Sequence, residues 1–194
     1  IYRPPSFVKY QLLSVTISSD EDSPYYSCEM ELRNYKDYAD FPRDQPFLVH
    51  LFDQDYQFVV DSRSLSRGMD GEGNLQNTVT ISGLSPLCLK SGPRATPITK
   101  TWDTPTLASE IVTELLGANT WSLVDWMIPA YRLAADHAYP LDIAQQVVTA
   151  VGGLIESQPD GSLVCRPRWP TSIPDFDSAT PDHLLTEKSI YAIT

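Results

Sequence analysis

The sequence has 194 residues, which is enough for one large domain or two small ones. With 42% hydrophobic and 20% charged residues, it has the composition of a folded chain with a buried core and not that of a disordered one. Its 14 basic and 25 acidic side chains give a net charge of −11, which disfavours binding to nucleic acid and to anionic membranes. No apolar run approaches the ~20 residues that cross a bilayer, so we expect no membrane segment.

The first half of the chain predicts short antiparallel strands. In residues 25–33, Tyr26, Cys28, Met30 and Leu32 alternate with polar residues, which is typical of a strand buried on one face. A polar turn joins this strand to the one before it, so the two predict a hairpin. The expected strands are residues 10–18, 25–33, 47–52, 56–61 and 77–83. Short strands at this spacing favour a small antiparallel barrel or sandwich.

The second half predicts a small α+β domain. The composition changes near residues 91–97, so we place a boundary there and expect an antiparallel β-barrel-like domain in residues 1–97 and an α+β domain in residues 98–194. The first residues lack an initiator Met and a signal pattern, and residues 189–194 alternate like a strand. We therefore expect a piece of a longer protein, with the second domain truncated at its C-terminus.

Two helices and a hairpin are expected in this second domain. Thr104 and Pro105 predict the N-cap and first position of a helix that ends at Gly117. A second helix is expected to begin at Pro140 and to stop at Gly152-Gly153. Asp160-Gly161 then predicts the turn of a hairpin between residues 154–156 and 162–166.

No motif for catalysis, a cofactor or a metal emerges. The histidines His50, His137 and His183 share no ligand spacing; we expect His50 in the core or a barrel wall and the other two in solvent. The stretch from Asp70 resembles a calcium loop, but Leu75 and Ile81 stand where glycine and glutamate are required, so we expect a flexible turn. We expect no catalytic residue, no cofactor-binding residue and no metal ligand, and thus not an enzyme.

Cysteines and carboxylates have simple interpretations. Cys28, Cys88 and Cys165 lie far apart and are odd in number, so we expect buried free thiols. The acidic groups at residues 20–22 and at Asp175, Asp177 and Asp182 are expected in solvated loops, because clusters of this kind arise by chance among 25 acidic residues.

Three aromatic residues, Trp121, Trp126 and Tyr131, recur at a five-residue spacing that fits neither a helix nor a strand. Such side chains can pack in the core, anchor a protein interface or stack on a sugar. We place core packing first, an interface second and sugar binding third, and we name these three residues as the candidate interface.

Three longer stretches carry a family resemblance. The first is residues 77–89, a strand followed by Ser82-Gly83-Leu84-Ser85-Pro86. The second is the expected helix 107–117 followed by residues 121–129. The third is residues 139–170, a helix that passes through Gly152-Gly153 into a hairpin and a basic, proline-containing segment; Ala179-Thr180-Pro181-Asp182 comes later. In this order they resemble the N-terminal portion of the tail hub (baseplate hub) proteins of long-tailed bacteriophages. The chain departs from that pattern at Leu84, where arginine is expected, and at Tyr139, where threonine is expected; residues 1–74 match mainly in strand pattern.

The resemblance implies a structural role and no enzymatic activity. It implies a tail-tube-like β-barrel joined to a smaller α+β domain, in a homotrimer at the tail tip that continues the tail tube and adapts sixfold to threefold symmetry. The implied partners are the tail tube, the distal tail protein and a tail fibre or spike, in a virion assembled in the cytoplasm of the bacterial host. DNA would pass through the lumen without specific binding, since an acidic wall repels it.

Two other readings are weighed against this one. A carbohydrate-binding or other interaction module of a tail or cell-surface protein would use Trp121, Trp126 and Trp169, and it predicts a monomer with exposed tryptophans. A cell-wall hydrolase would require a carboxylate with a raised pKa in a cleft, and no sequence feature points to one.

Overall fold

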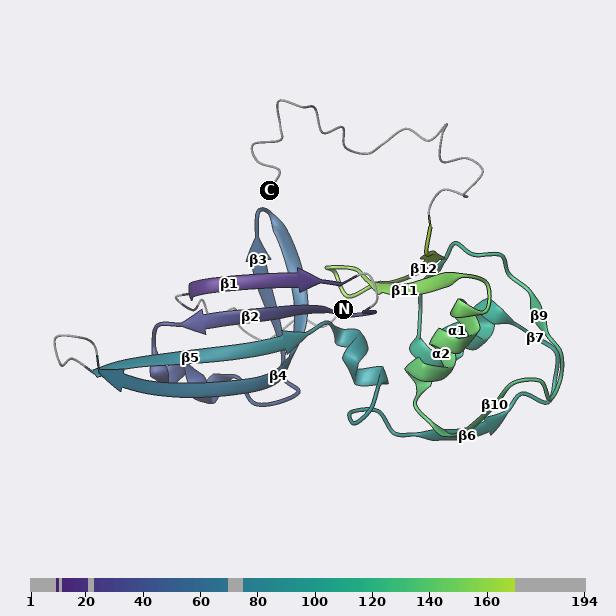
Figure 1. Cartoon of the computed structure of the whole chain (residues 1–194), viewed down its shortest axis with the longest axis horizontal. Coiled ribbons are helices and arrows are strands. Elements are labelled where there is room, and N and C mark those ends of the chain that lie inside the picture. The colour runs from purple at the N-terminus through teal and green to yellow at the C-terminus, as the bar shows by residue number, and fades with distance from the viewer. Residues whose placement is uncertain (1–9, 11, 21–22, 70–74, 170–194) are drawn as a thin grey trace, which may run out of the picture.

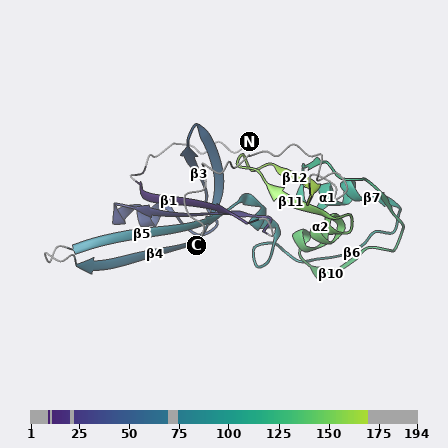
Figure 2. The ribbon, with the colours of Figure 1, turned by 45° about the horizontal axis from the view of Figure 1, so that its top comes forward.

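The computed structural model describes residues 10, 12–20, 23–69 and 75–169. Two lobes follow one another along the long axis of the molecule, as Figures 1 and 2 show from two directions. We call residues 10–84 the first lobe and residues 85–169 the second lobe. Several sequence expectations lie outside the described residues: most of the loop from Asp70, His183, the carboxylates of Asp175, Asp177 and Asp182, and Ala179–Asp182. No helix in the described ranges is both long and apolar enough to cross a membrane.

The first lobe is a five-stranded antiparallel sheet in the order β1-β2-β5-β4-β3. The strands are β1 (Leu12–Ser19), β2 (Tyr26–Leu32), β3 (Pro46–Leu51), β4 (Gln54–Met69) and β5 (Leu75–Leu84). The predicted hairpin of β1 and β2 is confirmed, and all five expected strands are present. The 3-10 helix η1 (Tyr35–Asp40) lies between β2 and β3, and the side chain of Asn34 accepts a hydrogen bond from the backbone N–H of Lys36 at its start.

The sheet curls because β4 has two partners in succession. Its first residues pair with β3 and its later residues with β5, and the register shifts between Val60 and Ser62, so that Asp61 is an extra residue. A bulge of this kind bends a strand and increases its twist. Figure 1 shows β3 and the start of β4 rising steeply from the plane of β1, β2 and β5.

One face of this sheet holds the core of the first lobe. The predicted alternation of β2 is confirmed, since Tyr26, Cys28, Met30 and Leu32 are buried and Glu29 between them is exposed. The remaining buried members of this cluster are Phe41, Val49, Phe58, Val60, Val79 and Ile81. The sheet leaves β1 and β3 as its two edges, so a curled open sheet is observed.

The second lobe combines helices with short strands. It contains η2 (Pro86–Lys90), α1 (Ala108–Leu116), α2 (Pro140–Thr149) and the short strands β6 (Ile98–Thr101), β7 (Thr106–Leu107), β8 (Thr120–Trp121), β9 (Met127–Ile128), β10 (Ala134–Ala138), β11 (Gly153–Ser157) and β12 (Leu163–Pro167). The predicted hairpin is confirmed as β11–β12, and β8 adds to it in parallel. The pairs β6–β10 and β7–β9 are antiparallel.

Both helices pack their apolar stripes into a second core. The apolar stripe of α1 is buried at Ile111, Val112 and Leu115, and that of α2 at Ala144 and Val147. Leu87, Trp102, Leu133, Ile155, Leu163 and Cys165 complete this cluster from the surrounding strands and from η2. The lobes therefore have separate apolar clusters, and the mixed α+β class is confirmed.

Three local expectations are wrong. Helix α1 begins after Leu107 and not at Thr104, because Thr106 and Leu107 pair with β9, and the carboxylate of Asp125 caps the helix by accepting a hydrogen bond from Ser109 N–H at 3.1 Å. The turn expected at residues 82–86 begins at Ser85, because Gly83 and Leu84 still pair with β2 and β4.

The third concerns His50, which is exposed and not in a core or wall. It lies on the outer face of β3, where Val49 before it is buried, and its Nδ1 lies 2.7 Å from Asp55 Oδ1. His137 is exposed, as predicted, and lies in β10.

Candidate functional site

The two lobes meet at a polar junction built around the β11–β12 turn. The hydroxyl of Tyr26 on β2 has three carbonyl oxygens within hydrogen-bonding distance: that of Gln57 at 2.9 Å, and those of Gln158 and Pro159 at 3.1 Å each. The backbone N–H of Gln57 donates to Pro159 O at 2.9 Å. Burial raises the pKa of the Tyr26 phenol well above its usual value, so the hydroxyl stays protonated and remains a donor. The predicted Asp-Gly turn thus joins the lobes as well as its own strands.

Two buried serines extend this junction. The hydroxyl of Ser85, at the end of β5, donates to Ser157 Oγ at the end of β11 over 3.0 Å, and both residues are buried. Ser85 N–H donates to Tyr26 O, and Ser157 N–H donates to Pro24 O. Because buried polar groups without partners are costly, these bonds fix where one lobe meets the other.

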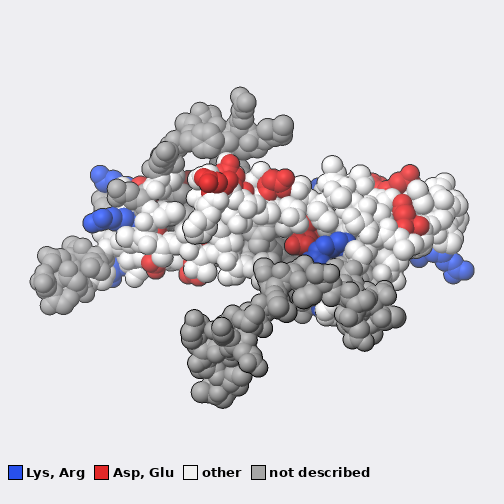
Figure 3. All heavy atoms as spheres, turned by 90° about the horizontal axis from the view of Figure 1, so that it is seen from above, with Lys and Arg blue, Asp and Glu red and all other residues white. Residues whose placement is uncertain are grey.

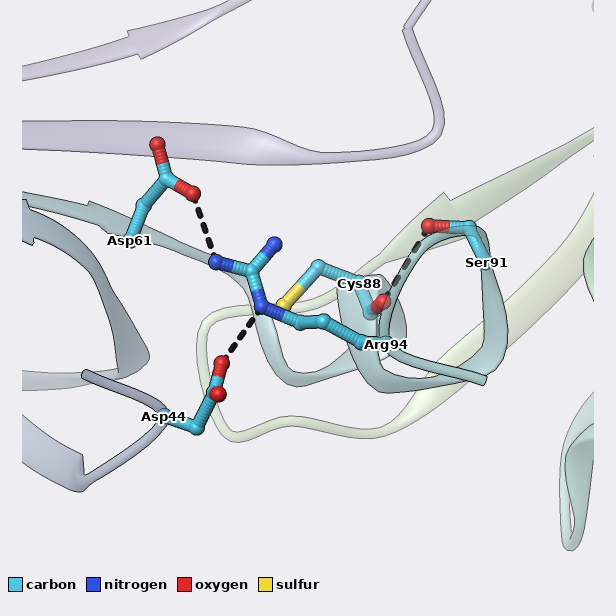
Figure 4. Close-up of polar contacts among 5 residues, drawn as sticks. All are labelled: Asp44, Asp61, Cys88, Ser91 and Arg94. Carbon is cyan, nitrogen blue, oxygen red and sulfur yellow. Dashed lines mark hydrogen bonds and ion pairs between the residues drawn. The ribbon is translucent and has the colours of Figure 1, made fainter. Parts of the chain in front are cut away.

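An ion-pair cluster also joins the two lobes, and Figure 4 shows its arrangement. Arg94 Nε lies 2.6 Å from Asp44 Oδ1, and Arg94 Nη2 lies 2.5 Å from Asp61 Oδ1. The arginine side chain is 9% exposed, whereas the two aspartate side chains are 50% and 40% exposed. One guanidinium of the second lobe therefore binds two separate segments of the first.

Local backbone features place all three charged groups. Asp61 is the extra residue of the β4 bulge, which redirects its side chain out of the strand alternation. Asp44 has a positive φ of 64° in a turn that is closed by Gln45 N–H donating to Pro42 O, and its own N–H donates to Val60 O on β4. Arg94 lies in a turn in which its N–H and that of Ala95 both donate to Ser91 O, and the Gly92-Pro93 bond just before it is cis.

The chemistry of this cluster is structural. Burial lowers the pKa of Arg94, but the hydrogen bonds to Asp61 and Asp44 outweigh it and raise the pKa further, so the guanidinium is a permanent cation. Burial also raises the pKa of the neighbouring Cys88 thiol, and the charge of Arg94 only partly opposes this. A protonated thiol is a poor nucleophile. Neither Arg94 nor Cys88 is therefore an activated group.

The sequence-predicted interface residues are separated by the fold. Trp121 and Trp126 are partly buried against the core of the second lobe, in agreement with the first of the three readings. Tyr131 is 73% exposed and has a positive φ of 62°. Whether any of the three forms an interface stays a prediction.

An open apolar groove lies beside two of these residues. It has a volume of about 260 Å³ and lies between α2 and the segment that follows β9. Its lining consists of Trp126, Ile128, Pro129, Arg132, Leu133, Gln146, Val147 and Ala150. Sequence reasoning named Trp126 and the neighbouring Tyr131 from their spacing, but it did not find the groove, because α2 and the strand segment that form it meet only in the fold.

No metal centre is visible in the described part of the chain, where no group of three or more His, Cys, Asp or Glu side chains could hold an ion. All three cysteines are free and buried, as predicted. Arg94, Asp44 and Asp61 were missed by the sequence analysis. The contacts of Arg94 join residues 50 and 33 positions apart, so no local pattern connects them.

Comparison with known proteins adds a fold relationship. No protein-family model matches the sequence, and no curated protein matches it either. The tail protein from Neisseria meningitidis MC58 is similar in structure, with a TM-score of 0.55 and 14% sequence identity over 78% of this chain. The 43 kDa tail protein of prophage MuSo2 from Shewanella oneidensis is also similar, with a TM-score of 0.51 and 14% identity over 82% of this chain. The fold is similar to that of tail proteins.

The tail-protein likeness includes both lobes. Neither lobe holds half of the 194 residues, so an alignment over 78% of the chain must include parts of each. The aligned regions cover only 44% of the first tail protein and 51% of the second. This chain therefore corresponds to about half of either protein.

Proposed function

We propose that this chain is a structural part of a bacteriophage tail, in a hub ring at the tail tip that continues the tail tube. The observation that carries the proposal is the similarity of fold to two tail proteins across both lobes. The order of strands, helices and hairpin that suggested a hub agrees with this similarity. In this proposal three copies form the ring, within the virion, and contact the tail tube, the distal tail protein and a fibre or spike.

Charge supports a conduit for DNA. The net charge is −11, and Figure 3 shows acidic side chains spread over both lobes on one face, where Lys and Arg form no continuous patch. Since DNA is repelled by an acidic wall, a lumen lined by such a face would let it pass without adhering.

Open strand edges support assembly with other subunits. β1 and β3 are the edges of the sheet, and on β1 Leu12 and Leu13 are 44% and 55% exposed. An uncovered edge with apolar side chains invites pairing with another chain. A ring in which neighbouring subunits cover these edges, and which completes the expected barrel between subunits, would remove that exposure.

The tryptophans give less support to a carbohydrate-binding module. Sugar stacking requires exposed ring faces, yet Trp102 is 4% exposed and Trp121 and Trp126 are partly buried against the core. Trp169 is 61% exposed, with the guanidinium of Arg168 5.9 Å from its ring centre. A single exposed indole is a weak platform, so a ring subunit is the better reading.

The test is the oligomeric state of the full-length protein, measured by light scattering and followed by negative-stain imaging. We expect trimers that appear as rings with an open channel. A compact monomer at high concentration in every salt condition would contradict the hub. A tryptophan fluorescence shift on adding cell-wall sugars would then favour the binding module.

A further inference from the structure

The turn between β3 and β4 carries an exposed phenylalanine in a conformation that side chains rarely adopt. Phe52 and Asp53 are its two central residues, with φ of 49° and 63°, and Phe52 is 95% exposed. Two-residue hairpin turns with positive φ at both positions favour Asn-Gly, because other side chains are strained there. With 95% of its side chain exposed, Phe52 buries almost none of its surface within the described chain, and a packing partner outside the molecule would offset this strain.

The groove of the second lobe has the size and chemistry to receive such a side chain. Its volume of about 260 Å³ lies below the ~300–1,000 Å³ of typical small-molecule sites, but it can hold one aromatic ring. Trp126, Ile128, Leu133 and Val147 make its walls apolar, and Arg132 is its one charged lining residue. Buried aromatic anchors in pockets of this kind dominate many protein interfaces.

Charge is complementary between the turn and the groove. Asp53 follows Phe52 directly, and within the described ranges it has no ion-pair partner; the same holds for the exposed Arg132. The other carboxylate at this turn, Asp55, lies 2.7 Å from His50. We infer that Phe52 of one copy inserts into the groove of a second copy, where Asp53 pairs with Arg132.

The contact has to join different copies. The Phe52 turn belongs to the first lobe and the groove to the second, and Figures 1 and 2 place β3 and α2 in separate lobes. An interface between two different surfaces is heterologous, and its repetition closes a ring when the rotation between copies allows it. The inference thus rests on the proposed ring and names the contact that builds it.

A disulfide between copies tests the geometry directly. Phe52→Cys and Ala150→Cys are made on separate chains, since Ala150 is an exposed lining residue of the groove. The native thiols are buried and do not compete. Under a mild oxidant we expect covalent dimers when the two chains are mixed, and none from either chain alone. The matched control is Leu89→Cys, a 43% exposed site elsewhere on the second lobe, which should not link to Phe52→Cys.

Charge exchange in the whole chain gives the second test. Phe52→Asp should weaken association about tenfold or more, as expected for a central aromatic anchor. Asp53→Arg and Arg132→Asp should each weaken it, and the pair together should restore it. All are surface positions, and circular dichroism checks folding.

The outcomes separate this contact from the ring itself. Trimers that tolerate Phe52→Asp, or Phe52→Cys chains that link to one another, overturn the contact and leave the ring proposal standing. A chain that stays monomeric overturns both.

Discussion

Three buried thiols show how burial sets chemistry at single residues. Cys28 is 2% exposed and Cys165 is fully buried, and burial raises the pKa of Cys28 to about 12 and that of Cys165 to about 11. The neighbouring Glu29 raises the pKa of Cys28 further. Since the thiolate is the reactive form, these side chains act as small apolar groups and not as nucleophiles.

This burial makes the protein sensitive to alkali. In the unfolded chain a thiol ionises near its ordinary pKa of 9.0, while burial in the folded protein raises the pKa of Cys165 to about 11 and that of Cys28 to about 12. The contribution of these two thiols to the free energy of unfolding is complete below pH 9 and is lost as the pH rises toward 11–12. We expect the free energy of unfolding to fall by up to about 1.4 kcal/mol per pH unit for each such thiol. Urea denaturation at pH 8, 9 and 10 measures this.

The control is Cys28→Ala, which removes one titrating group from the first lobe. Its stability should be lower at pH 8 but should decline less steeply toward pH 10 than that of the wild type. Equal slopes would mean that tyrosine or lysine titration causes the decline. In addition, thiol reagents at pH 8 should label the native protein slowly and the urea-unfolded chain at all three cysteines.

The burial of a residue was predictable where it follows from the residues next to it in the sequence. The alternation Tyr26, Cys28, Met30, Leu32 identified a buried face correctly, because a strand has a strict period of two. The same rule, applied to the apolar run around His50, would have placed that histidine outward, opposite to the buried Val49. Arg94 and its two aspartates gave no signal, since they meet only when the lobes are joined.

At the scale of elements, β5 shows why a glycine lies inside a central strand. A Cβ at Gly83 would lie 2.6 Å from Cζ of Phe47 and 3.2 Å from Cβ of Phe58. These two rings stack with centres 5.4 Å apart, and Phe41 makes an edge-on contact with Phe47 at 5.8 Å between ring centres. Because Phe47 is held by both rings, it has little room to move, and the curled corner of the sheet depends on the missing side chain.

We therefore expect Gly83→Ala to lower the free energy of unfolding by about 1–3 kcal/mol, the usual range for an overpacked core. The matched control is Gly68→Ala on β4, where no atom lies within 4 Å of the added Cβ. That change should be neutral or slightly stabilising, since alanine loses less backbone entropy on folding. Thermal or urea denaturation compares the two variants, and equal stability would contradict the packing argument.

Elements were predicted well where a pattern is long and poorly where strands are short. The stripes of α1 and α2 and the Asp-Gly hairpin were found, because each has several residues in register. The two-residue strands β7, β8 and β9 were missed, since two residues form no period. Pairing of β7 with β9 also displaced the expected start of α1, and the cap comes from Asp125, which follows the helix in sequence.

At the scale of the whole molecule, two apolar clusters are joined by polar contacts and by Tyr25 of the first lobe, which packs partly buried against the second cluster. Leu87 belongs to the cluster of the second lobe, and Ile81 belongs to that of the first. The boundary near residue 97 that composition suggested stays a prediction; we propose that the lobes are separate domains that the junction couples. The Arg94 ion pairs and the hydrogen bonds of Tyr26 and Ser85 then determine whether the domains unfold together.

This coupling can be measured because all four tryptophans, at positions 102, 121, 126 and 169, lie in the second lobe. Tryptophan fluorescence reports unfolding of that lobe alone, and far-ultraviolet circular dichroism reports both. We expect coincident urea transitions for the wild type. Arg94→Gln removes both ion pairs of a 9% exposed guanidinium and leaves two half-exposed carboxylates that water can solvate.

We expect Arg94→Gln to lower the free energy of unfolding by about 1–2 kcal/mol, a value between those of exposed ion pairs and of buried hydrogen bonds to charged groups. We also expect it to separate the fluorescence transition from the circular-dichroism transition. Arg43→Gln, an exposed arginine beside Asp44, is the control and should leave them coincident. If Arg94→Gln lowers stability while both probes still agree, the lobes form one cooperative domain.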